Sequence, residues 1–368
     1  MHRVFIVFVL SFVIACAPRG QLTLDPQASL VGSIQPVFIG TTRDIDEDGS
    51  FGTHRSEKTY FGRYDISIPP KRKAGEIKYP PRRAAPDPQV DFLTTSEIRY
   101  PNDSTFRQDL RKNLIANGGE AVIFVHGFNN NFAEGLYRVA QFSHDLRLPG
   151  TIIHYSWPSA ANPLGYVYDR DSALFARDGL ENLIQEVSDA GANRILLVAH
   201  SMGAALTMEA LRQTAIRGNR KALDRIAGVI LISPDIDVDV FREQAHAIGK
   251  LPQPFIIFGS DRDKVLRISA GLTGQSARLG SIKNIDRLAD LDVTFLDVSN
   301  FSEGAGHFVM GDSAALLSLM SRIIDIDSAF ERDRRDRIGL LPGAILTVQN
   351  ATEIVLAPVG DVAAELTK

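Results

Sequence analysis

The sequence predicts an α/β fold built on a mostly parallel, doubly wound sheet. Six short apolar runs, rich in β-branched residues, are spread over residues 121–298 and read AVIFV, TIIHYS, RILLVA, AGVILI, PFIIF and VTFLDV. Continuous runs of this kind are typical of strands that are covered on both faces. Longer segments with helical spacing separate the runs, and strands that alternate with amphipathic helices favour a parallel sheet.

Two of the intervening segments have clear helical periodicity. Residues 131–146 repeat apolar side chains three and four positions apart, so we predict a helix there. For residues 169–190 we predict a second helix. The apolar side that we expect this helix to bury consists of Leu174, Leu180, Ile184 and Val187.

The segment before this core predicts two further strands, which we expect to be antiparallel. Residues 36–44 (PVFIGTTRD) form the first, and residues 51–70 contain a turn and the second, which Pro69 and Pro70 end. Residues 71–90 are rich in Pro, Lys and Arg and predict an extended surface loop. The basic run in this loop could contact anionic lipid headgroups, but a solvated loop is the simpler account.

The C-terminal region predicts a small β-structure. Residues 343–359 (GAILTVQNATEIVLAPV) have the pattern of strand, turn and strand, and we expect them to pair with the N-terminal strands or to form a small appendage. The domain division that follows is a signal peptide over 1–15, a tether over 16–35, the main domain over 36–324 and an extension over 325–368.

Composition limits the classes of function. The chain has 368 residues, of which 44% are hydrophobic and 23% charged, enough for a sizeable core in an ordinary soluble protein. The formal net charge is -4 and there is no long basic block, so charge gives no support for a nucleic-acid partner.

The N-terminus has the features of an export signal. A single basic residue, Arg3, precedes an apolar run over 4–15 that is too short to span a membrane comfortably. The run ends in VIAC, which resembles the lipobox of bacterial lipoproteins, where the signal is cut before the Cys and the Cys is lipidated. We therefore expect Cys16 to anchor the exported chain to a membrane of the bacterial envelope. The alternative is a signal peptide that is cut elsewhere. Cys16 is the only cysteine, so no intramolecular disulfide is possible.

Ser201 is the candidate nucleophile. In a doubly wound sheet, ligands bind at the carboxyl ends of the strands, and Ser201 follows the run RILLVA in the motif AHSMG. The usual signature is G-x-S-x-G, a Ser on a tight strand-to-helix turn. Ala199 replaces the first Gly, whereas Gly203 is kept, so the motif alone does not decide.

The order of residues along the chain supports a catalytic triad. A nucleophilic Ser needs a general base, which an acid must orient, and the three occur in the order Ser, acid, His in hydrolases of this architecture. Of the eight histidines, only His307 follows the strand that would carry the acid. Asp261 and Asp263 both follow the run PFIIF, and position alone leaves both open as the acid.

Two backbone N–H groups are candidates for an oxyanion hole. One belongs to Met202, directly after the nucleophile, and the other to Phe128 in the loop HGFN. Gly127 lets the backbone approach a substrate without a Cβ in the way. The alternative is that HGFN is an ordinary turn in which an asparagine of residues 129–131 caps the next helix.

Trp157 and the aspartates of SPDID have weaker interpretations. Trp157 follows the second core strand and either lines an acyl-binding pocket or packs within a loop. Asp235 and Asp237 are expected to brace the site loops or to cap the helix that follows. No His or Cys lies near them in sequence, so they do not indicate a metal site.

Taken together, the motifs resemble a known family. FVHGFNN, YSWPS, AHSMG and SPDID stand in this order, and with DKVLRIS and the late His they are similar to a family of bacterial α/β-hydrolases of unknown function, often described as esterase- or lipase-like. The resemblance runs from about Val37 to about Ile324 and implies an α/β-hydrolase fold. It implies Ser201 as nucleophile, His307 as base, and Phe128 and Met202 as oxyanion donors.

The same resemblance selects between the two aspartates. The family places its acid in a pattern like D-x-A-L-x-x-S, which this chain matches with Asp263, Leu266 and Ser269 and from which Val265 departs. The resemblance therefore implies Asp263 rather than Asp261. Nothing comparable matches residues 325–368.

The expected function is that of a serine hydrolase. We expect it to cleave an ester-type bond in a small-molecule or lipid substrate through an acyl-enzyme, a reaction that needs no metal or organic cofactor. The alternative is a non-catalytic binding or scaffold protein of the envelope that retains the fold. A dinucleotide-binding oxidoreductase is disfavoured, because HGFNNN lacks the G-x-G-x-x-G spacing.

Overall fold

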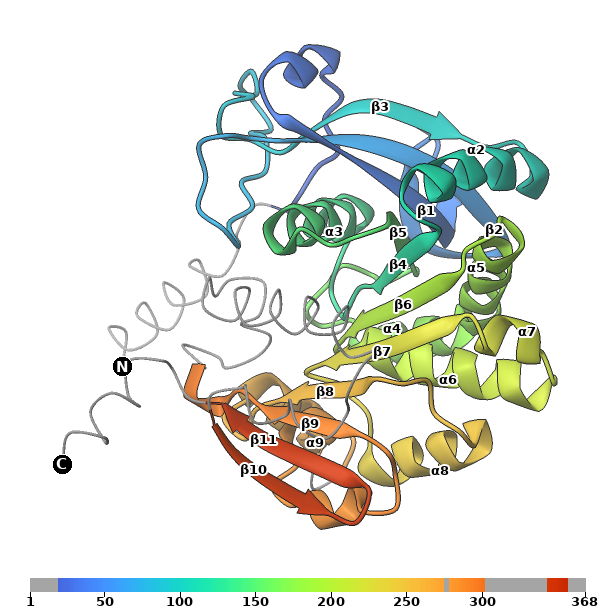
Figure 1. Cartoon of the computed structure of the whole chain (residues 1–368). Helices are drawn as coiled ribbons and strands as arrows, with labels where there is room; N and C mark the ends of the chain where they lie inside the picture. Colours follow the sequence, from blue (N-terminus) through green and yellow to red (C-terminus); the bar gives the residue numbers. More distant parts are fainter. Residues whose placement is uncertain (1–18, 275–277, 302–342, 357–368) are drawn as a thin grey trace, which may run out of the picture.

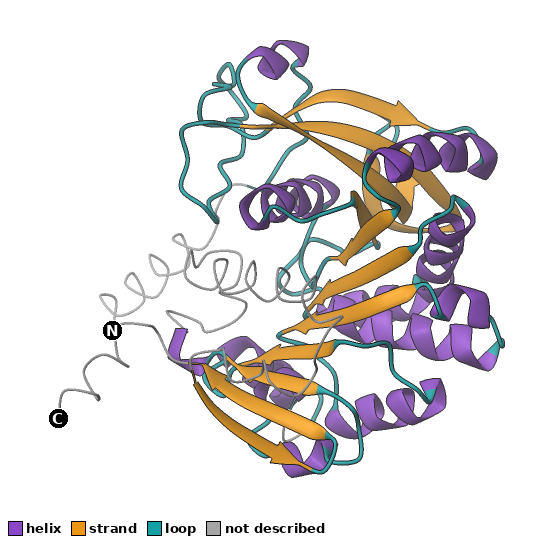
Figure 2. Cartoon of the chain, viewed as in Figure 1, coloured by secondary structure: helices purple, strands orange, loops and turns teal. Residues whose placement is uncertain are grey.

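A computed structural model of the chain describes residues 19–274, 278–301 and 343–356 (Figure 1). Within these residues, eleven strands form one mixed sheet in the order β10-β11-β9-β8-β7-β6-β4-β5-β1-β2-β3. Helices α2, α5, α6 and α8 bury their apolar sides against one face of the sheet, and α3 covers the other (Figure 2). The predicted fold class, mostly parallel with antiparallel strands at the N-terminus, is confirmed.

The centre of the sheet consists of the six predicted core strands. They are parallel to one another, and β4 lies between β5 and β6. Their bounds are β4 Glu120–Val125, β5 Thr151–Ser156, β6 Arg194–His200, β7 Ile226–Ile232, β8 Phe255–Gly259 and β9 Thr294–Asp297. The continuous apolar runs predicted them because helices or loops cover both faces.

Three N-terminal strands extend the sheet beyond β5. Strand β1 (Ser33–Ile45) is parallel to β5 and antiparallel to β2 (Phe51–Ile68). The two strands predicted here are therefore confirmed. A third, β3 (Leu93–Arg99), forms the edge and was not predicted, because its second half is polar and exposed.

The C-terminal hairpin lies at the opposite edge. Strands β10 (Gly343–Val348) and β11 (Ala351–Leu356) form the predicted strand, turn and strand. Both expected placements were wrong, because β11 pairs in parallel with β9 and extends the main sheet. The pairing covers an edge that β9 would otherwise expose, and it buries Ile354 and Leu356.

The helices connect these strands in order. Their bounds are α2 Asp103–Ala116, α3 Phe132–Leu146, α4 Tyr166–Phe175, α5 Arg177–Asp189, α6 Met202–Ile216, α7 Arg220–Leu223, α8 Val238–Ile248 and α9 Lys264–Leu272. Short 3-10 turns are η2 Pro26–Leu30, η3 Leu279–Ser281, η4 Ile285–Leu288 and η5 Ser299–Phe301. No helix among the described residues is long and apolar enough to cross a membrane.

The single helix predicted over 169–190 is two helices. The chain changes direction at the buried Ala176, which ends α4 and precedes α5. Leu180, Ile184 and Val187 are buried as predicted, but Leu174 is 52% exposed. The break takes Leu174 off the buried face, because it lies on the other helix.

The predicted tether over 16–35 is ordered in its described part. From Arg19 the chain packs against α3, forms η2 and enters β1 at Ser33. Arg19 and Gly20 bind the side chain of Glu134. The prediction of a tether was therefore wrong for the described residues 19–35, because these polar contacts fix the segment before the first strand. Cys16 lies outside the described residues.

Candidate active site

Ser201 lies where strand β6 ends and helix α6 begins. Its φ is 51° and its ψ is −121°, so a non-glycine residue has a positive φ. A conformation of this kind costs about 1–3 kcal/mol and clusters at functional sites. The geometry is that of the sharp strand-to-helix turn on which a nucleophilic serine is presented.

The residues on either side explain the imperfect motif. A Cβ added at Gly203 would lie 2.3 Å from the carbonyl oxygen of His126, so helix α6 approaches the end of β4 as closely as glycine permits. Ala199 is a buried residue of β6, and its methyl group packs within the core. Of the two glycines in the G-x-S-x-G signature, the turn therefore requires the one at Gly203, which the chain keeps.

The loop after β4 passes directly over Ser201. A Cβ added at Gly127 would lie 3.0 Å from the Cβ of Ser201 and 2.6 Å from Nδ1 of His200. Glycine at this position is thus needed for the close approach. The contact brings HGFN and AHSMG together at the carboxyl ends of neighbouring strands, as expected.

Two N–H groups beside Ser201 are suited to an oxyanion. Within the described residues, the N–H of Phe128 donates to no acceptor. Met202 is the first residue of α6, and an N–H at that position has no acceptor inside its own helix. Both predicted oxyanion donors are therefore available next to the predicted nucleophile.

Side chains of the same loop fix the peptide between Gly127 and Phe128. The imidazole Nδ1 of His126 lies 2.8 Å from the carbonyl oxygen of Gly127. Asn130 Nδ2 donates to the carbonyl oxygens of Phe128 at 2.9 Å and of Gly127 at 3.3 Å. Because a peptide is planar, fixing the Gly127 carbonyl also fixes the direction of the Phe128 N–H.

The same turn also caps a helix, as the alternative interpretation predicted. Asn131 Oδ1 accepts from the N–H of Glu134, and Glu134 accepts from the N–H of Asn131, which forms a capping box at the start of α3. The capping interpretation is confirmed, and it is compatible with the oxyanion interpretation, which stays a prediction. Of the three asparagines, Asn131 is the cap.

A buried pair of opposite charges lies beneath this loop. Arg43 is completely buried, and its Nη2 donates to the carbonyl oxygen of Asn130 at 2.9 Å. Asp169, also buried, accepts from the N–H of Asn129 at 3.1 Å and from the hydroxyl of Ser159 at 2.6 Å. Ser159 in turn accepts from the N–H of Asn130 at 3.2 Å.

Burial shifts the pKa values of both charged groups toward their neutral forms. Burial lowers the pKa of Arg43 to about 10, and the negative charges of Asp169 and Glu134 oppose that shift. Burial raises the pKa of Asp169, against hydrogen bonds from Ser159 and from two backbone N–H groups. Sequence analysis identified neither Arg43 nor Asp169. The available signal for Arg43 was an arginine three residues after the apolar strand segment VFIG.

Trp157 packs behind the loop and does not line a substrate pocket. It is completely buried, its ring stacks on His126 at 4.8 Å, and its Nε1 donates to the His126 carbonyl oxygen at 2.7 Å. The pocket interpretation was wrong, because a residue without exposed surface cannot contact a substrate. Trp157 instead supports the start of the HGFN loop.

The two candidate acids have different surroundings. Asp263 is completely buried after β8, and its Oδ1 accepts from the N–H of Leu266 at 2.9 Å, which caps α9. Asp261 is exposed to solvent, and its backbone N–H donates to Ser299. A carboxylate has two oxygens, so capping a helix is compatible with orienting an imidazole. The geometry therefore favours Asp263. His307 lies outside the described residues.

The aspartates of SPDID have the structural roles that were expected. Asp237 caps α8 by accepting from two backbone N–H groups. The N–H of Asp235 donates to the carbonyl oxygen of Ser201 at 3.2 Å. Its Oδ1 accepts from Ser269 at 2.6 Å, which links the last residue of the D-x-x-L-x-x-S pattern to the turn that carries the nucleophile.

Two residues that sequence analysis missed complete this contact. Arg278 forms a buried ion pair with Asp235 at 3.0 Å, and the hydroxyl of Tyr166 donates to Asp235 at 2.9 Å. Burial raises the pKa of Tyr166 to about 12. The Tyr166 ring meets Phe128 edge-on at 5.6 Å, so α4 begins beside the predicted oxyanion loop.

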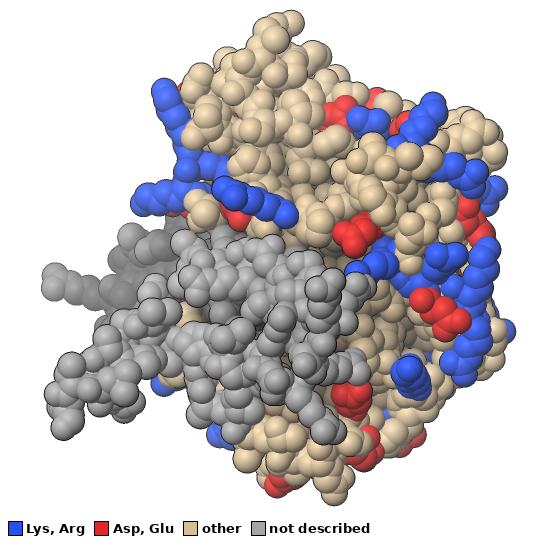
Figure 3. Space-filling view, viewed as in Figure 1, with Lys and Arg blue, Asp and Glu red and all other residues tan. Residues whose placement is uncertain are grey.

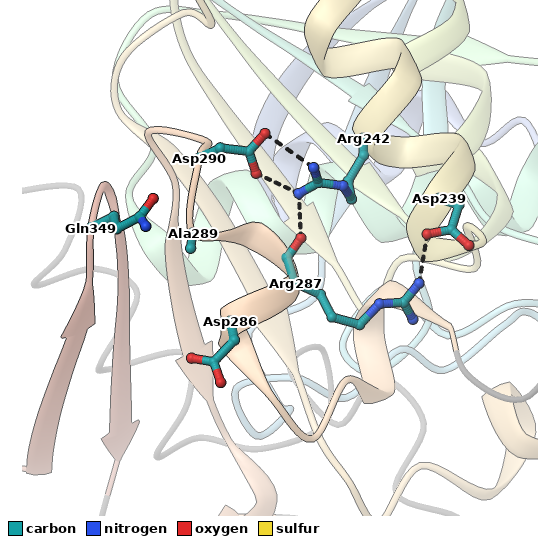
Figure 4. Close-up of a pocket in the computed structure, with 7 residues that line it drawn as sticks. All are labelled: Asp239, Arg242, Asp286, Arg287, Ala289, Asp290 and Gln349. Carbon is teal, nitrogen blue, oxygen red and sulfur yellow. Dashed lines mark hydrogen bonds and ion pairs between the residues drawn. The ribbon is translucent and has the colours of Figure 1, made fainter.

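A charged hollow lies apart from Ser201, between α8, η4 and the β10–β11 turn (Figure 4). It is open to solvent, and four of its five charged residues form ion pairs, Arg242 with Asp290 and Arg287 with Asp239, the latter at 2.6 Å. Its lining contains no Ser, Cys or His. Among the described residues, no group of three or more His, Cys, Asp or Glu could hold a metal ion.

The sheet order, the strained serine turn and the two N–H groups define an α/β-hydrolase. A family model described as "alpha/beta hydrolase of unknown function (DUF900)" matches residues 102–324, more than half of the chain. The chain belongs to this family. The predicted resemblance is thus confirmed, although strands β1–β3 precede the matched region.

Several solved structures are similar to the chain at low identity. An esterase of Pyrococcus furiosus is 12% identical, with 84% of this chain and 96% of that chain covered and a TM-score of 0.39. An α/β-hydrolase from the metagenome of Lake Arreo is 12% identical, with coverage of 82% and 84% and a TM-score of 0.38. An esterase of Pyrobaculum calidifontis is 10% identical, with coverage of 63% and 94% and a TM-score of 0.35. No curated protein matches the chain.

Proposed function

We propose that the protein is a serine hydrolase that cleaves ester-type bonds. The observation that carries the proposal is the backbone of Ser201, whose φ of 51° holds a serine on a turn between β6 and α6. The chain maintains this strained conformation with glycine at 203 and a loop that lies on the serine. Strain of this kind at a strand end is expected where a nucleophile must be presented.

In the proposed reaction, Ser201 Oγ attacks the carbonyl carbon of the ester while His307 takes the hydroxyl proton. The N–H groups of Phe128 and Met202 donate to the oxyanion that forms. The tetrahedral intermediate then collapses, and His307 gives the proton to the leaving alcohol. Water attacks the acyl-enzyme by the same route in reverse and releases the acid. Asp263 orients His307 and stabilises its charged form.

The test is covalent labelling with a fluorophosphonate, together with turnover of p-nitrophenyl butyrate. We expect the full-length chain to be labelled and active, and Ser201→Ala to lose both. The matched control is Ser233→Ala, because Ser233 is another buried serine at a strand end and also has a positive φ, of 43°. Labelling that persists in Ser201→Ala refutes the assignment of the nucleophile.

The same experiment decides between an enzyme and a scaffold. A non-catalytic envelope protein that retained this fold would neither react with the probe nor turn over any ester.

We also propose that the chain is exported and anchored to a membrane through a lipid on Cys16, for which the motif VIAC is the support. Mass spectrometry of the mature N-terminal peptide tests the modification.

A further inference from the structure

We infer that the rim of the active site faces the lipid surface that carries the anchor, and that the substrates are acyl esters held in that surface. The rim is defined here as Phe128, Asn129 and Tyr166, all of which are partly exposed. The inference rests on the proposed hydrolase function and on a lipid at Cys16. Three separate features of the described residues support it.

The first feature is the contact between the N-terminal segment and the rim. Arg19 Nη1 donates to Asn129 Oδ1 at 2.8 Å, and its Nη2 donates to the Asn129 carbonyl oxygen at 3.0 Å. Asn131 Nδ2 donates to the carbonyl oxygen of Gly20 at 2.8 Å. The chain that follows the proposed anchor is therefore held on the loop that carries the oxyanion donor.

The short segment between Cys16 and Arg19 limits how the domain can be oriented on the membrane. Only two residues separate Cys16 from Arg19, and three residue steps span at most about 11 Å of extended chain. A lipid on Cys16 must then enter the membrane within that distance of Arg19. A long flexible linker would allow the domain many orientations on the membrane, whereas this short segment, bound to the HGFN loop, restricts them.

The second feature is a pair of exposed apolar side chains beside the rim. Leu164 is 92% exposed and Val167 is 73% exposed, and they lie on either side of Tyr166 in the chain. Tyr166 in turn contacts Phe128. Side chains of this type gain free energy by leaving water, and a lipid surface on this side of the domain would receive them.

The third feature is the basic loop between β2 and β3, which lies on the same side as the N-terminal segment. A Cβ added at Gly20 would lie 2.9 Å from Tyr79 Cε1, so this loop packs directly on the segment that follows the anchor. Basic side chains project where the loop runs (Figure 3). Four exposed members form no ion pair with any described residue: Lys71, Lys73, Arg82 and Arg83.

The three features together match the requirements of stable attachment to an anionic bilayer. A polybasic patch beside a lipid anchor adds electrostatic attraction to an anionic surface. Each basic residue near an anionic surface strengthens binding about fivefold. An anchor, a basic loop and exposed apolar side chains meet around the rim, so the occupant of this surface is an anionic lipid bilayer. Its esters are then the substrates nearest to Ser201.

The orientation can be measured with a fluorescent label on the full-length chain. Leu164→Cys introduces a thiol beside the rim, and Ile216→Cys is the matched control. Ile216 is 63% exposed at the far end of α6, whose 15 residues carry it about 20 Å from Ser201. In vesicles of phosphatidylglycerol with brominated acyl chains, we expect quenching of a label at 164 and little at 216. Equal quenching at both positions overturns the inference, as does an unmodified Cys16.

The substrate class needs a second measurement on the same vesicles. The variant Leu164→Glu/Val167→Glu is compared with Ile216→Glu on two substrates, the phosphatidylglycerol of the vesicle and soluble p-nitrophenyl butyrate. We expect the double variant to lose at least tenfold on the vesicle lipid and to keep its activity on the soluble ester. The control should match wild type on both.

The outcomes separate this inference from the proposed function. Turnover of the soluble ester without turnover of vesicle lipid by the wild-type chain leaves the hydrolase standing and overturns the lipid substrate. Failure on both substrates, with no fluorophosphonate labelling, removes the hydrolase itself. Vesicle activity that is equal in the double variant and in wild type overturns the placement of the rim at the membrane.

Discussion

Replacing Arg43 by methionine should reduce catalysis more than its effect on stability explains. The side chain donates to the carbonyl oxygens of Asn130, Gly52 and Ser159 and to the hydroxyl of Ser156. Its removal leaves three carbonyl oxygens without this donor. It also leaves the nearby carboxylate of Asp169 without its compensating charge. Breaking a buried charged network in this way costs about 3–5 kcal/mol of the free energy of unfolding.

The catalytic part of the effect follows from the loop above Arg43. Asn130 positions the carbonyls of Gly127 and Phe128, and the peptide between them carries the proposed oxyanion donor. A displacement of about 1 Å in a positioning group costs about a hundredfold in rate. We expect Arg43→Met to lower kcat by about that factor with little change in KM, because the donor acts mainly on the transition state. Arg43→Lys keeps the charge but not the forked donor and should recover part of the loss.

The assay measures kcat, KM and Tm for p-nitrophenyl butyrate, well below the melting temperature of each variant. The matched control is Arg72→Met, because Arg72 is also a largely buried arginine, and it pairs with Asp145 on α3, away from the HGFN loop. Both variants should lose stability, and only Arg43→Met should lose kcat. Equal kcat values for the folded fractions of the two variants would refute the role assigned to Arg43.

Three further predictions follow from the same geometry. Asp263→Asn should lower kcat about 10³–10⁴-fold, whereas Asp261→Asn should leave it within twofold; the reverse pattern in steady-state kinetics would exchange the two assignments. Gly203→Ala should lower Tm and remove activity, because its methyl group would meet the His126 carbonyl, whereas Gly271→Ala has open space and should not. Burial lowers the pKa of His154 to about 3, so the unfolded chain binds a proton more readily than the folded one between pH 6.5 and 3. Stability should therefore fall by up to about 1.4 kcal/mol per pH unit from this group as the pH drops below 6.5. The free energy of unfolding of His154→Phe, measured with urea, should therefore depend less steeply on pH below 6.5 than that of the wild-type chain. An unchanged pH dependence contradicts the prediction.

Local patterns predicted the centre of the fold well and its edges poorly. The core strands are covered on both faces, which forces continuous apolar runs that can be recognised in the sequence. Helix α2 was missed, although its buried residues Phe106, Leu110 and Leu114 have helical spacing, because mostly polar residues surround them. The position of the C-terminal hairpin could not be predicted, because the partner of a strand is set by contacts distant in sequence.

The same distinction applies to the site. Ser201 and the two N–H groups were predicted from their order and local motifs at the ends of parallel strands, whereas Asp263 was preferred to Asp261 only through the family resemblance. Arg43, Asp169 and Arg278 were not predicted, because a charged residue in a sequence is expected at the surface. Each of them is buried, and each is stabilised by partners from other elements. Buried charged residues that support a loop are thus harder to predict than candidate residues at the strand ends.

The contacts of the HGFN loop extend beyond the region that the family model matches. That region begins at residue 102, yet Arg19 and Arg43 precede it and bind the loop at Asn129 and Asn130. Strand β1 also pairs with β5, which would otherwise be an open edge. A chain that began at residue 102 would lose both arginines and leave the carboxylate of Asp169 without its nearest compensating charge. The N-terminal segment and β1 therefore support the HGFN loop, and the proposed oxyanion donor at Phe128 lies in a loop held by residues distant from it in the sequence.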